Sequence, residues 1–467
     1  MRKTTIITDP IHQVMNLGSD PRLQSCLKSV MDTREFQRLR RITQLGLTSY
    51  VFPGATHTRF SHSLGVAYLA REVLAHLLER EEDLRVEIED VLLEVVLAAL
   101  LHDVGHGPFS HSFEHVLGNV EWIPKHEDWT GTLITNRASG IQKVLTEARI
   151  DPEKVASAVT KSTSSSLARP YRQIVSSQID VDRMDYLLRD SHFAGVTVGH
   201  FDAQYLINSM VIINHDSDKS TRTLGLTPKG IKAYEAFLLA RQLMNRTVYF
   251  HHNVKVLEFM LESILRIAID GLQEFAADST VSPTLPPYLK RVREARDGGC
   301  TSKQQFMDQA MSDYVNLTED AVWVLVAAIA NSSADRSAQI LAQRLLRRSI
   351  LLHFQVAHDK EDLLDQALRR AGFRDPIDYH LLDLTTTMYK GSGDEGVFVR
   401  DWGGNIEEVT GLSGTITAFR DRPEVESLLI VVDGSKAEQI RALGIDGQFI
   451  LPPPASIAKE TPVVSPQ

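Results

Sequence analysis

The sequence LHDVGHGPFSH at residues 101–111 follows an apolar run, Val91–Leu101, in which Glu94 is the one charged residue. Such a run is typical of a helix that is buried on every side. The glycines and the proline of the quoted stretch predict that the helix ends there. His102 and Asp103 therefore close an apolar helix, where burial is costly unless the two side chains are paired or bind a metal ion. The stretch predicts either a buried His–Asp hydrogen bond or a metal site.

Histidines are concentrated around this stretch, because eight of the 17 in the 467-residue chain lie between residues 57 and 126. A metal ion needs further ligands, and His62 at the start of another predicted helix is one candidate. A third predicted helix carries Asp182, although spacing alone does not choose it over Asp180 or Asp185. Two imidazoles and two carboxylates suit a divalent ion that keeps open positions for water and a phosphate oxygen.

The composition excludes several classes of protein. The net charge of −10 argues against a general nucleic-acid binder, although binding of single strands stays open. Cys26 and Cys300 are the only cysteines, which excludes a disulfide framework and a cysteine-rich zinc module and favours a reducing compartment. The N-terminus lacks the apolar run of a signal peptide, and Val91–Leu101 is too short to cross a bilayer. We therefore expect a cytoplasmic protein without a membrane segment.

The chain is expected to be mainly α, since most segments repeat apolar residues at helical spacing. The predicted helices span residues 63–84, 91–101, 179–189, 229–243, 254–275, 319–330 and 337–354. A small hairpin is expected from Met210–Asn214 and Arg222–Leu226, which flank a polar turn. After about residue 380 the pattern changes, and it predicts strands at 396–400, 414–419 and 427–432 and a short helix at 436–443.

These patterns divide the chain into four parts. Residues 1–285 form a helical core that includes the histidine-rich region, and a proline-bearing stretch near 282–287 precedes a helical lobe at 286–380. A small C-terminal α+β appendage follows at 381–450. Residues 451–467 include five prolines and few side chains that could pack, which predicts a disordered tail.

Four residues resemble the H…HD…D signature of the HD-domain metal-dependent phosphohydrolases: His62, His102, Asp103 and Asp182. The segments 32–46, 51–57 and 102–110 are similar to one branch of that family, the deoxynucleoside triphosphate triphosphohydrolases of bacteria and their mammalian relatives with SAM and HD domains. The resemblance covers about residues 9–355 and implies a helical core of the HD type. It does not extend into the appendage, which takes no function from it.

The resemblance implies that these four side chains bind a divalent metal ion, with Mn, Mg, Fe, Co, Ni and Zn all compatible. It also implies that three more histidines line the phosphates of a substrate: His106, His111 and His126. His111 and Glu114 are spaced i and i+3 on a predicted helix, so the carboxylate can orient the imidazole and keep it protonated. Such a pair is suited to act as a general acid.

Other matched positions would surround the rest of the substrate: Gln44, Leu45, Arg59, Arg183, Tyr186, Asp190, Arg241 and Tyr249. The three arginines are candidate phosphate clamps, because a guanidinium group pairs with phosphate oxygens through two hydrogen bonds. By the resemblance, Asp190 would accept a hydrogen bond from a 3′-hydroxyl. Leu45 and the ring of Tyr249 would leave no room for a 2′-hydroxyl.

The resemblance therefore implies a hydrolase that releases a deoxynucleoside and intact triphosphate from a dNTP, by attack of a metal-activated water on the α-phosphorus. The alternatives are another HD chemistry, a 5′-nucleotidase or a cyclic-nucleotide phosphodiesterase, and a non-catalytic nucleotide sensor on the same fold. The number of arginines and histidines around the core exceeds what a monophosphate requires, which disfavours the other HD chemistries. A non-catalytic sensor would be expected to have lost a metal ligand or His111, and all of these residues are present. Walker-type, dinucleotide-binding and G-x-S-x-G motifs do not occur, which disfavours kinases, Rossmann enzymes and serine hydrolases.

A second polar group precedes the metal motif and consists of Asp32, Gln37 and Arg40. These residues match positions at which the mammalian relatives recognise a guanine nucleotide as an activator, while the alternative is a solvated helix that packs through Phe36 and Leu39. An activator site would lie between subunits, since a nucleotide favours assembly only by binding the assembled form better. The expectation is a homo-oligomer, a dimer or a tetramer, that responds to GTP or dGTP.

Overall fold

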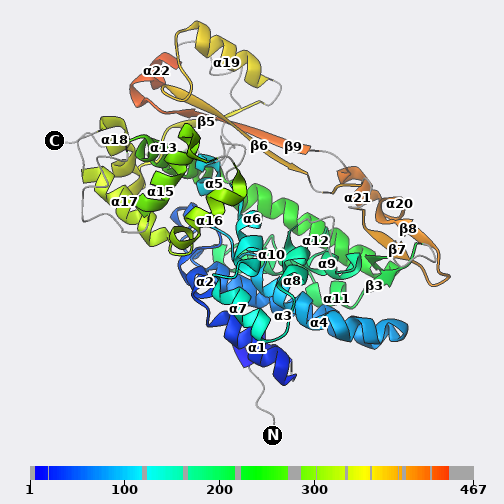
Figure 1. Cartoon of the computed structure of the whole chain (residues 1–467). Coiled ribbons are helices and arrows are strands. Elements are labelled where there is room, and N and C mark those ends of the chain that lie inside the picture. The colour runs from blue at the N-terminus through cyan, green and yellow to red at the C-terminus, as the bar shows by residue number, and fades with distance from the viewer. Residues whose placement is uncertain are drawn as a thin grey trace.

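The computed structural model describes residues 6–18, 20–117, 124–160, 167–215, 222–271, 285–300, 302–331, 335–357, 360–387, 389–391, 396–420 and 423–440, and the structural statements below concern these residues. Most of them lie in helices, which confirms the expected mainly α class (Figure 1). None of the helices they form is both long enough and apolar enough to span a membrane.

The N-terminal half begins with a β-hairpin, which the sequence patterns did not predict, and continues as helices. Its elements are β1 (Ile6–Asp9), β2 (Gln13–Asn16), α1 (Pro21–Met31), α2 (Arg34–Gln37), α3 (Arg59–Arg80), α4 (Arg85–Leu101), α5 (His111–Leu117), α6 (His126–Thr135), α7 (Gly140–Glu147), α8 (Pro152–Val159), α9 (Arg169–Val175), α10 (Val181–Ala194) and α11 (Ala203–Ile207). In the centre, α3 packs along α4, and α10 packs on α3.

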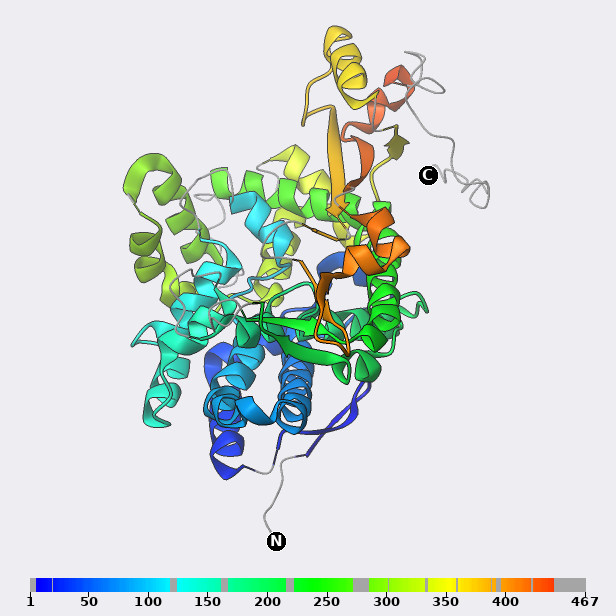
Figure 2. The same cartoon turned by 90° about the vertical axis from the view of Figure 1, so that its right-hand side faces the viewer.

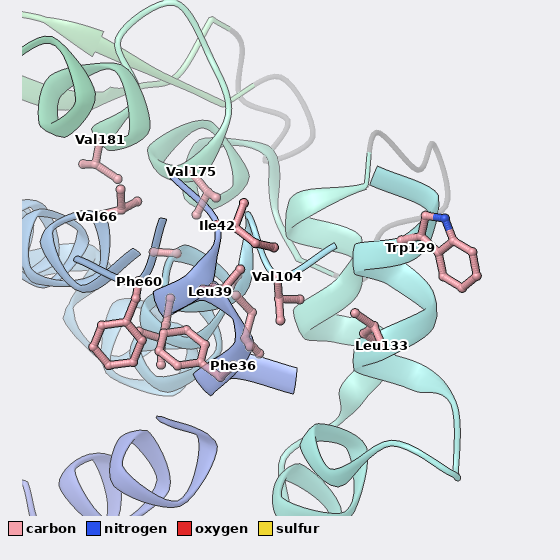
Figure 3. Close-up of a cluster of buried hydrophobic side chains, with 14 of the residues drawn as sticks. Phe36, Leu39, Ile42, Phe60, Val66, Val104, Trp129, Leu133, Val175 and Val181 are labelled. Atoms are coloured by element: carbon pink, nitrogen blue, oxygen red, sulfur yellow. The ribbon is translucent and has the colours of Figure 1, made fainter. Parts of the chain in front are cut away.

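Helix α4 is central because all of its residues from Val95 to Leu101 are buried. Burial of one aliphatic or aromatic side chain of this kind contributes about 1.5–3 kcal/mol to the free energy of unfolding. Figure 3 shows the neighbouring cluster, in which the ring of Phe36 packs against that of Phe60 of α3, and Ile42 lies toward Val104 and Val175. The end of α4 is thereby fixed in the core, and so are the residues that follow it.

Helix α10 has clear signals at both ends. The carboxylate of Asp180 accepts a hydrogen bond from the backbone N–H of Arg183 at 2.9 Å and caps the N-terminus. Gly195 ends the helix at a φ of 72°, a conformation that glycine adopts without strain. These ends place Asp182 in the first turn and the polar residues that follow it on a helix that faces α3.

The second half combines helices with two small sheets. Its elements are β3 (Met210–Ile213), β4 (Thr223–Leu226), α12 (Ile231–Met244), α13 (His252–Asp270), α15 (Leu285–Glu294), α16 (Lys303–Tyr314), α17 (Glu319–Asn331), α18 (Arg336–Leu346), β5 (His353–Val356), α19 (Glu361–Arg370), β6 (Tyr379–Thr387), β7 (Phe398–Arg400), β8 (Ile406–Glu408), α20 (Val409–Leu412), α21 (Gly414–Phe419), β9 (Pro423–Val431) and α22 (Ala437–Ile440). Strands β3 and β4 pair as an antiparallel hairpin, as the sequence predicted.

Strands of the C-terminal part pair with strands of the preceding parts of the chain. A four-stranded sheet has the order β3-β4-β7-β8, and β7 pairs with β4 in parallel where Leu226 faces Val399. A second sheet has the antiparallel order β5-β9-β6. Strand β5 precedes residue 381 and β9 follows it, so the pairing crosses the predicted boundary between the lobe and the appendage. In Figure 1 the orange strands β7 and β8 lie beside the green hairpin region.

Two predictions of secondary structure are wrong. The segment 414–419 forms helix α21 and not a strand, because the Ser413 hydroxyl accepts from the backbone N–H of Ile416 at 3.1 Å and caps the turn. The predicted helix at 337–354 is too long, since α18 ends at Leu346 and strand β5 follows. The hairpin turn at 216–221 and the predicted tail at 451–467 lie outside the described residues.

Candidate active site

Four side chains from distant parts of the sequence converge at the C-terminal end of α4: His62, His102, Asp103 and Asp182. The Nε2 atoms of His62 and His102 lie 3.2 Å apart. Oδ1 of Asp182 lies 3.0 Å from Nε2 of His62 and 3.4 Å from Nε2 of His102. Oδ1 of Asp103 lies 3.4 Å from Nε2 of His102. Donor atoms at this spacing fit around one divalent ion with ligand bonds of about 2.0–2.2 Å.

The second nitrogen of each imidazole ring is already engaged. Nδ1 of His102 donates to the backbone carbonyl of Ala99 at 2.8 Å, and Nδ1 of His62 pairs with Oδ2 of Asp185 at 2.8 Å. When both Nδ1 atoms carry hydrogen, the two Nε2 lone pairs face the same point and repel each other unless a cation or a proton lies between them. This donor set fits a metal ion of the kind that the resemblance implies.

A buried ionic network supports His62 from behind. Asp185 accepts two hydrogen bonds from Arg189, at 2.8 and 2.9 Å, and pairs with Nε2 of His12 at 2.6 Å. Arg189 also donates to both carboxylate oxygens of Asp9, at 2.7 and 3.2 Å. The unpredicted β1–β2 hairpin region supplies Asp9 and His12, so this region fixes the carboxylate that orients His62.

Gly65 permits the close approach of α3 and α10 at this point. A Cβ atom at residue 65 would lie 1.9 Å from Oδ1 of Asp185 and 2.5 Å from the Arg189 guanidinium. Any larger residue would have to displace the buried network that holds His62. The glycine inside α3 is therefore required by packing and not by backbone conformation.

The carboxylates strongly affect the two imidazoles of this centre. Burial favours the neutral ring of His62, but hydrogen bonds and charge from Asp182 and Asp185 prevail and raise its pKa to about 10. The pKa of His102 is also raised, because the nearby carboxylates outweigh its burial. Metal binding to such rings must displace protons.

A basic wall, consisting of Arg59, His106 and His126, borders the four candidate ligands. Arg59 contacts the carboxylate of Asp103 and donates to the Ser110 hydroxyl from Nε at 3.0 Å and from a terminal nitrogen at 2.7 Å. Nε2 of His106 lies 3.2 Å from Oδ1 of Asp103. The rings of His106 and His126 stack with centroids 4.0 Å apart. Burial and the charge of Arg59 hold the pKa of His106 well below its ordinary value, so this ring is neutral.

Glu114 of α5 orients His126. Oε1 of Glu114 accepts from the backbone N–H of His126 and pairs with its Nδ1, each at 2.8 Å. Burial opposes protonation of His126, but the hydrogen bond and charge of Glu114 raise its pKa. His111 is the first residue of α5, and its side chain lies outside the described part of the chain. The pairing of His111 with Glu114 therefore stays a prediction.

The backbone just before α5 adopts an uncommon conformation. Phe109 and Ser110 have φ values of 55° and 46°, which residues other than glycine rarely adopt. Ser110 uses this conformation to receive the two hydrogen bonds from Arg59. Such local strain persists where surrounding contacts fix it, as they do here.

Another group of predicted residues meets around Asp190. Oδ1 of Asp190 pairs with Nε2 of His57 at 2.7 Å, and the hydroxyl of Tyr249 donates to Oδ2 at 2.8 Å. The rings of Tyr186 and Tyr249 lie edge to face, with centroids 6.0 Å apart. The backbone N–H of Gln44 donates to the His57 carbonyl at 3.0 Å. The structure therefore brings together most of the residues predicted around the sugar, with Leu45 beside them in sequence and packed on the core.

The remaining predicted residues lie apart from these contacts. Arg183 donates to the Ser177 carbonyl at 2.5 Å and contacts the Asp180 carboxylate, and with Arg241 it lines a cavity. Gln37 and Arg40 share a surface as expected, since Nε of Arg40 donates to Oε1 of Gln37 at 2.8 Å. Asp32 is exposed at the end of α1, and the activator site stays a prediction.

Four residues that contact the site were not predicted from the sequence: Asp9, His12, His57 and Ser110. His12 and Asp185 are 173 positions apart, so no local pattern connects them. His57 lies in the histidine-rich window, and that density was the one signal that could have identified it. Ser110 lies in the quoted stretch, but its role depends on a backbone conformation that sequence spacing does not show.

Comparisons with known proteins identify the class of this fold and site. Residues 59–190 match the family model described as HD domain, and residues 201–282 match the HD associated region. The four candidate ligands and the core of the site lie within the first match. The chain thus contains an HD domain followed by its associated region, and this supports a metal-dependent phosphohydrolase of the HD superfamily.

Individual relatives cover different shares of the chain. The uncharacterized protein YwfO of Bacillus subtilis is 28% identical over 92% of this chain and 94% of its own length. Human deoxynucleoside triphosphate triphosphohydrolase SAMHD1 is 31% identical over 57% of this chain, and this chain spans 45% of that protein. A crystal structure titled as a phosphohydrolase from Bacteroides thetaiotaomicron has a TM-score of 0.71 and 26% identity, and the match covers 92% of this chain and all of that one.

Proposed function

We propose that this protein hydrolyses deoxynucleoside triphosphates to deoxynucleosides and triphosphate with the help of a divalent metal ion. One observation carries the proposal: the basic wall lies directly beside the four candidate ligands. Arg59 contacts Asp103, and His106 lies 3.2 Å from the same carboxylate. A phosphate group at the metal centre would therefore meet a guanidinium and two imidazoles at once. The similarity to human SAMHD1 over part of both chains supports the choice of substrate.

The proposed roles follow from the contacts. The four candidate ligands would hold the ion, which when bound acidifies a water molecule and offsets negative charge on phosphate oxygens. Arg59 is fixed by Asp103 and Ser110, so its guanidinium is ready to bind a phosphate oxygen without further ordering. Glu114 keeps His126 protonated, and His126 would donate to the phosphate chain. His111 at the start of α5 is the proposed acid for the leaving 5′-oxygen.

The sugar would be recognised at Asp190. Among the described residues, one oxygen of Asp190 pairs with His57 and the other accepts from Tyr249, and each keeps a lone pair that can accept a hydrogen bond from a 3′-hydroxyl. The ring of Tyr249 is held in place by its own hydrogen bond to Asp190 and by Tyr186. A fixed ring here is a physical basis for rejecting a 2′-hydroxyl.

The product of hydrolysis tests this proposal. The full chain is incubated with each dNTP, each NTP, deoxynucleoside monophosphates and cyclic nucleotides, with Mn²⁺, Mg²⁺ or Co²⁺ and with EDTA as the metal-free control. Anion-exchange chromatography identifies the first product. We expect triphosphate and a deoxynucleoside from dNTPs alone, and no product in EDTA. Pyrophosphate or orthophosphate as the first product, or faster hydrolysis of a monophosphate or a cyclic nucleotide, would contradict the proposal.

A further inference from the structure

The turn that follows α4 contains three successive buried residues, Val104, Gly105 and His106, directly after the candidate ligand Asp103. These residues lie outside any helix, so their carbonyl groups are not paired within a helical ladder. A buried carbonyl without a hydrogen-bond donor is costly, and each of the three therefore needs a partner. The partners decide how the turn is oriented, and with it the side chains of Asp103 and His106.

Two of the three carbonyls accept hydrogen bonds from a single guanidinium group. One terminal nitrogen of Arg38 donates to the carbonyl of Val104 at 2.8 Å and to that of His106 at 2.7 Å. The other terminal nitrogen donates to the carbonyls of Tyr314 and Leu317, each at 3.3 Å. Arg38 is buried, and burial of a charged group is costly unless hydrogen bonds compensate it. Four carbonyls supply these bonds here, so the guanidinium joins the turn to the segment between α16 and α17.

The third carbonyl accepts from Tyr314, the last residue of α16. The hydroxyl of Tyr314 donates to the carbonyl of Gly105 at 2.5 Å. Burial raises the pKa of Tyr314, so the hydroxyl keeps the proton that it donates. The ring stacks on Trp129 of α6 with centroids 3.9 Å apart, and the guanidinium carbon of Arg38 lies 5.2 Å from the ring centroid. These contacts hold the hydroxyl at the turn.

Helix α6 also packs closely on the turn. The hydroxyl of Thr130 accepts from the backbone N–H of Gly105 at 3.0 Å and donates to the carbonyl of His102 at 3.2 Å. A Cβ atom at residue 105 would lie 2.3 Å from the carbonyl oxygen of His126 and from the backbone nitrogen of Thr130. Figure 2 shows the yellow-green helices of the lobe that contains α16 beside the cyan helices that follow the turn. The turn is thus bonded both to α6 and to this lobe.

We propose that Arg38 and Tyr314 are positioning residues of the metal centre, because they fix the direction in which Asp103 and His106 point. The backbone N–H of His106 donates to the carbonyl of Asp103 at 3.1 Å, so all four carbonyls from 103 to 106 are engaged. Each peptide group is planar, and a held carbonyl therefore restricts the backbone on both sides of it. What this inference says of turnover rests on the proposed function, whereas what it says of metal affinity does not.

The affinity of the full chain for Mn²⁺, measured by competition with a fluorescent chelator, tests the proposal. Tyr314→Phe deletes the hydroxyl and keeps the stacked ring. We expect it to weaken Mn²⁺ binding by about tenfold, as the loss of a group that orients a ligand does. Tyr288→Phe is the matched control, since Tyr288 is also buried beside the ring of Tyr314 but its hydroxyl makes no hydrogen bond to the turn among the described residues. It should bind Mn²⁺ as the wild type does.

Arg38→Lys is the second test, because it keeps the charge but loses the planar fork that reaches carbonyls in two directions. We expect it also to weaken Mn²⁺ binding by about tenfold or more. If this variant fails to fold, the result with Tyr314→Phe decides.

Equal Mn²⁺ affinity of Tyr314→Phe and the wild type would overturn the proposal, even with a lowered melting temperature, because a merely structural role changes stability and not affinity. Equal weakening by Tyr288→Phe, or no Mn²⁺ binding by the wild type, would overturn it as well. The chelator assay involves no turnover. Absence of dNTP hydrolysis would therefore refute the proposed function, while the Mn²⁺ affinities would still decide this inference.

Discussion

The metal centre and the basic wall are built differently, although they share the carboxylate of Asp103. In the centre, His62 is completely buried, and behind it Asp185 and Arg189 are completely buried as well. In the wall, the side chains of His126 and Glu114 are 19% and 21% exposed, and α5 begins after two residues with positive φ. The centre thus has its donors fixed before a metal ion arrives. The two regions are not closed to the same degree everywhere: Arg59 and His106 of the wall are buried as well, whereas the candidate ligand Asp182 has a side chain that is 31% exposed. A substrate can therefore approach the ion between Asp182 and His126.

This difference predicts which substitutions remove the ion and which change only the chemistry. Variants of the centre should alter metal content first and activity as a consequence. Variants of the basic wall, of Glu114 that orients it, and of the sugar side, which consists of Asp190 and Tyr249, should leave the metal in place. They should change the rate or the choice of substrate.

Replacing His102 and Asp103 together by alanine should remove the metal and abolish turnover, because it deletes two of the four donors. Desolvation of the clustered ionic groups offsets their mutual attraction, and Arg59 keeps its two hydrogen bonds to Ser110, so the folded chain should keep the helical circular dichroism spectrum of the wild type. Metal content by mass spectrometry and dNTP hydrolysis are the measurements. His76→Ala is the control, since His76 lies on α3, the helix of His62, but its imidazole pairs with the carbonyl of Met210 at 3.0 Å. A double variant with near-normal turnover would refute the assignment of the centre.

Glu114→Gln should lower kcat by about 10²–10⁴ while metal content stays unchanged, because the charge that keeps His126 protonated is lost. Steady-state kinetics at saturating metal concentration, with metal analysis of the same sample, measure both properties. A normal kcat would make Glu114 a structural residue. Loss of the metal ion from this variant would contradict the claim that substitutions beside the basic wall leave metal binding unchanged.

Asp185→Asn should weaken metal affinity by about 10–100-fold without abolishing turnover at high metal concentration. The substitution keeps the shape of the side chain but removes the charge that orients His62 and pairs with Arg189. Competition with a fluorescent chelator measures the affinity. An unchanged affinity would mean that the buried network contributes to stability alone. In that case the variant would have a lower melting temperature than the wild type.

Tyr249→Ala should reduce the preference for dNTP over NTP by about tenfold, since it opens space beside the sugar and frees one oxygen of Asp190. The ratio of kcat/KM for dGTP and GTP is the measurement, and metal affinity should not change. Asp190 still has its bond to His57, so the variant should remain folded. A wild-type protein with equal kcat/KM for the two nucleotides would refute the assignment of the sugar side.

The sequence predicted the ligands better than it predicted what supports them. An imidazole and a carboxylate at the end of an apolar helix indicated His102 and Asp103. The resemblance to the HD family chose Asp182 over Asp180 and Asp185, because spacing alone does not. The partners of Asp185 could not be predicted, because Asp9 and His12 come from a hairpin far away in the chain.

The fold of the C-terminal part was also hard to predict, because it depends on contacts between residues that are distant in sequence. Its strands pair with segments distant in sequence, as β7 does with β4 and β5 with β9. The three successive β-branched residues Thr415, Ile416 and Thr417 favour a strand, but the hydroxyl of Ser413 caps a helix at this position. Local patterns indicate local structure, whereas these long-range pairings, which join the C-terminal part to the core, depend on residues far away in the sequence.

The central claim is that water attacks the α-phosphorus of a nucleotide held between the metal centre and the basic wall. Hydrolysis of dATP in H₂¹⁸O, followed by mass spectrometry of both products, tests it most directly. The account predicts one ¹⁸O atom in the triphosphate and none in the deoxyadenosine. Label in the deoxyadenosine, or label in pyrophosphate or orthophosphate formed as the first product, would contradict it.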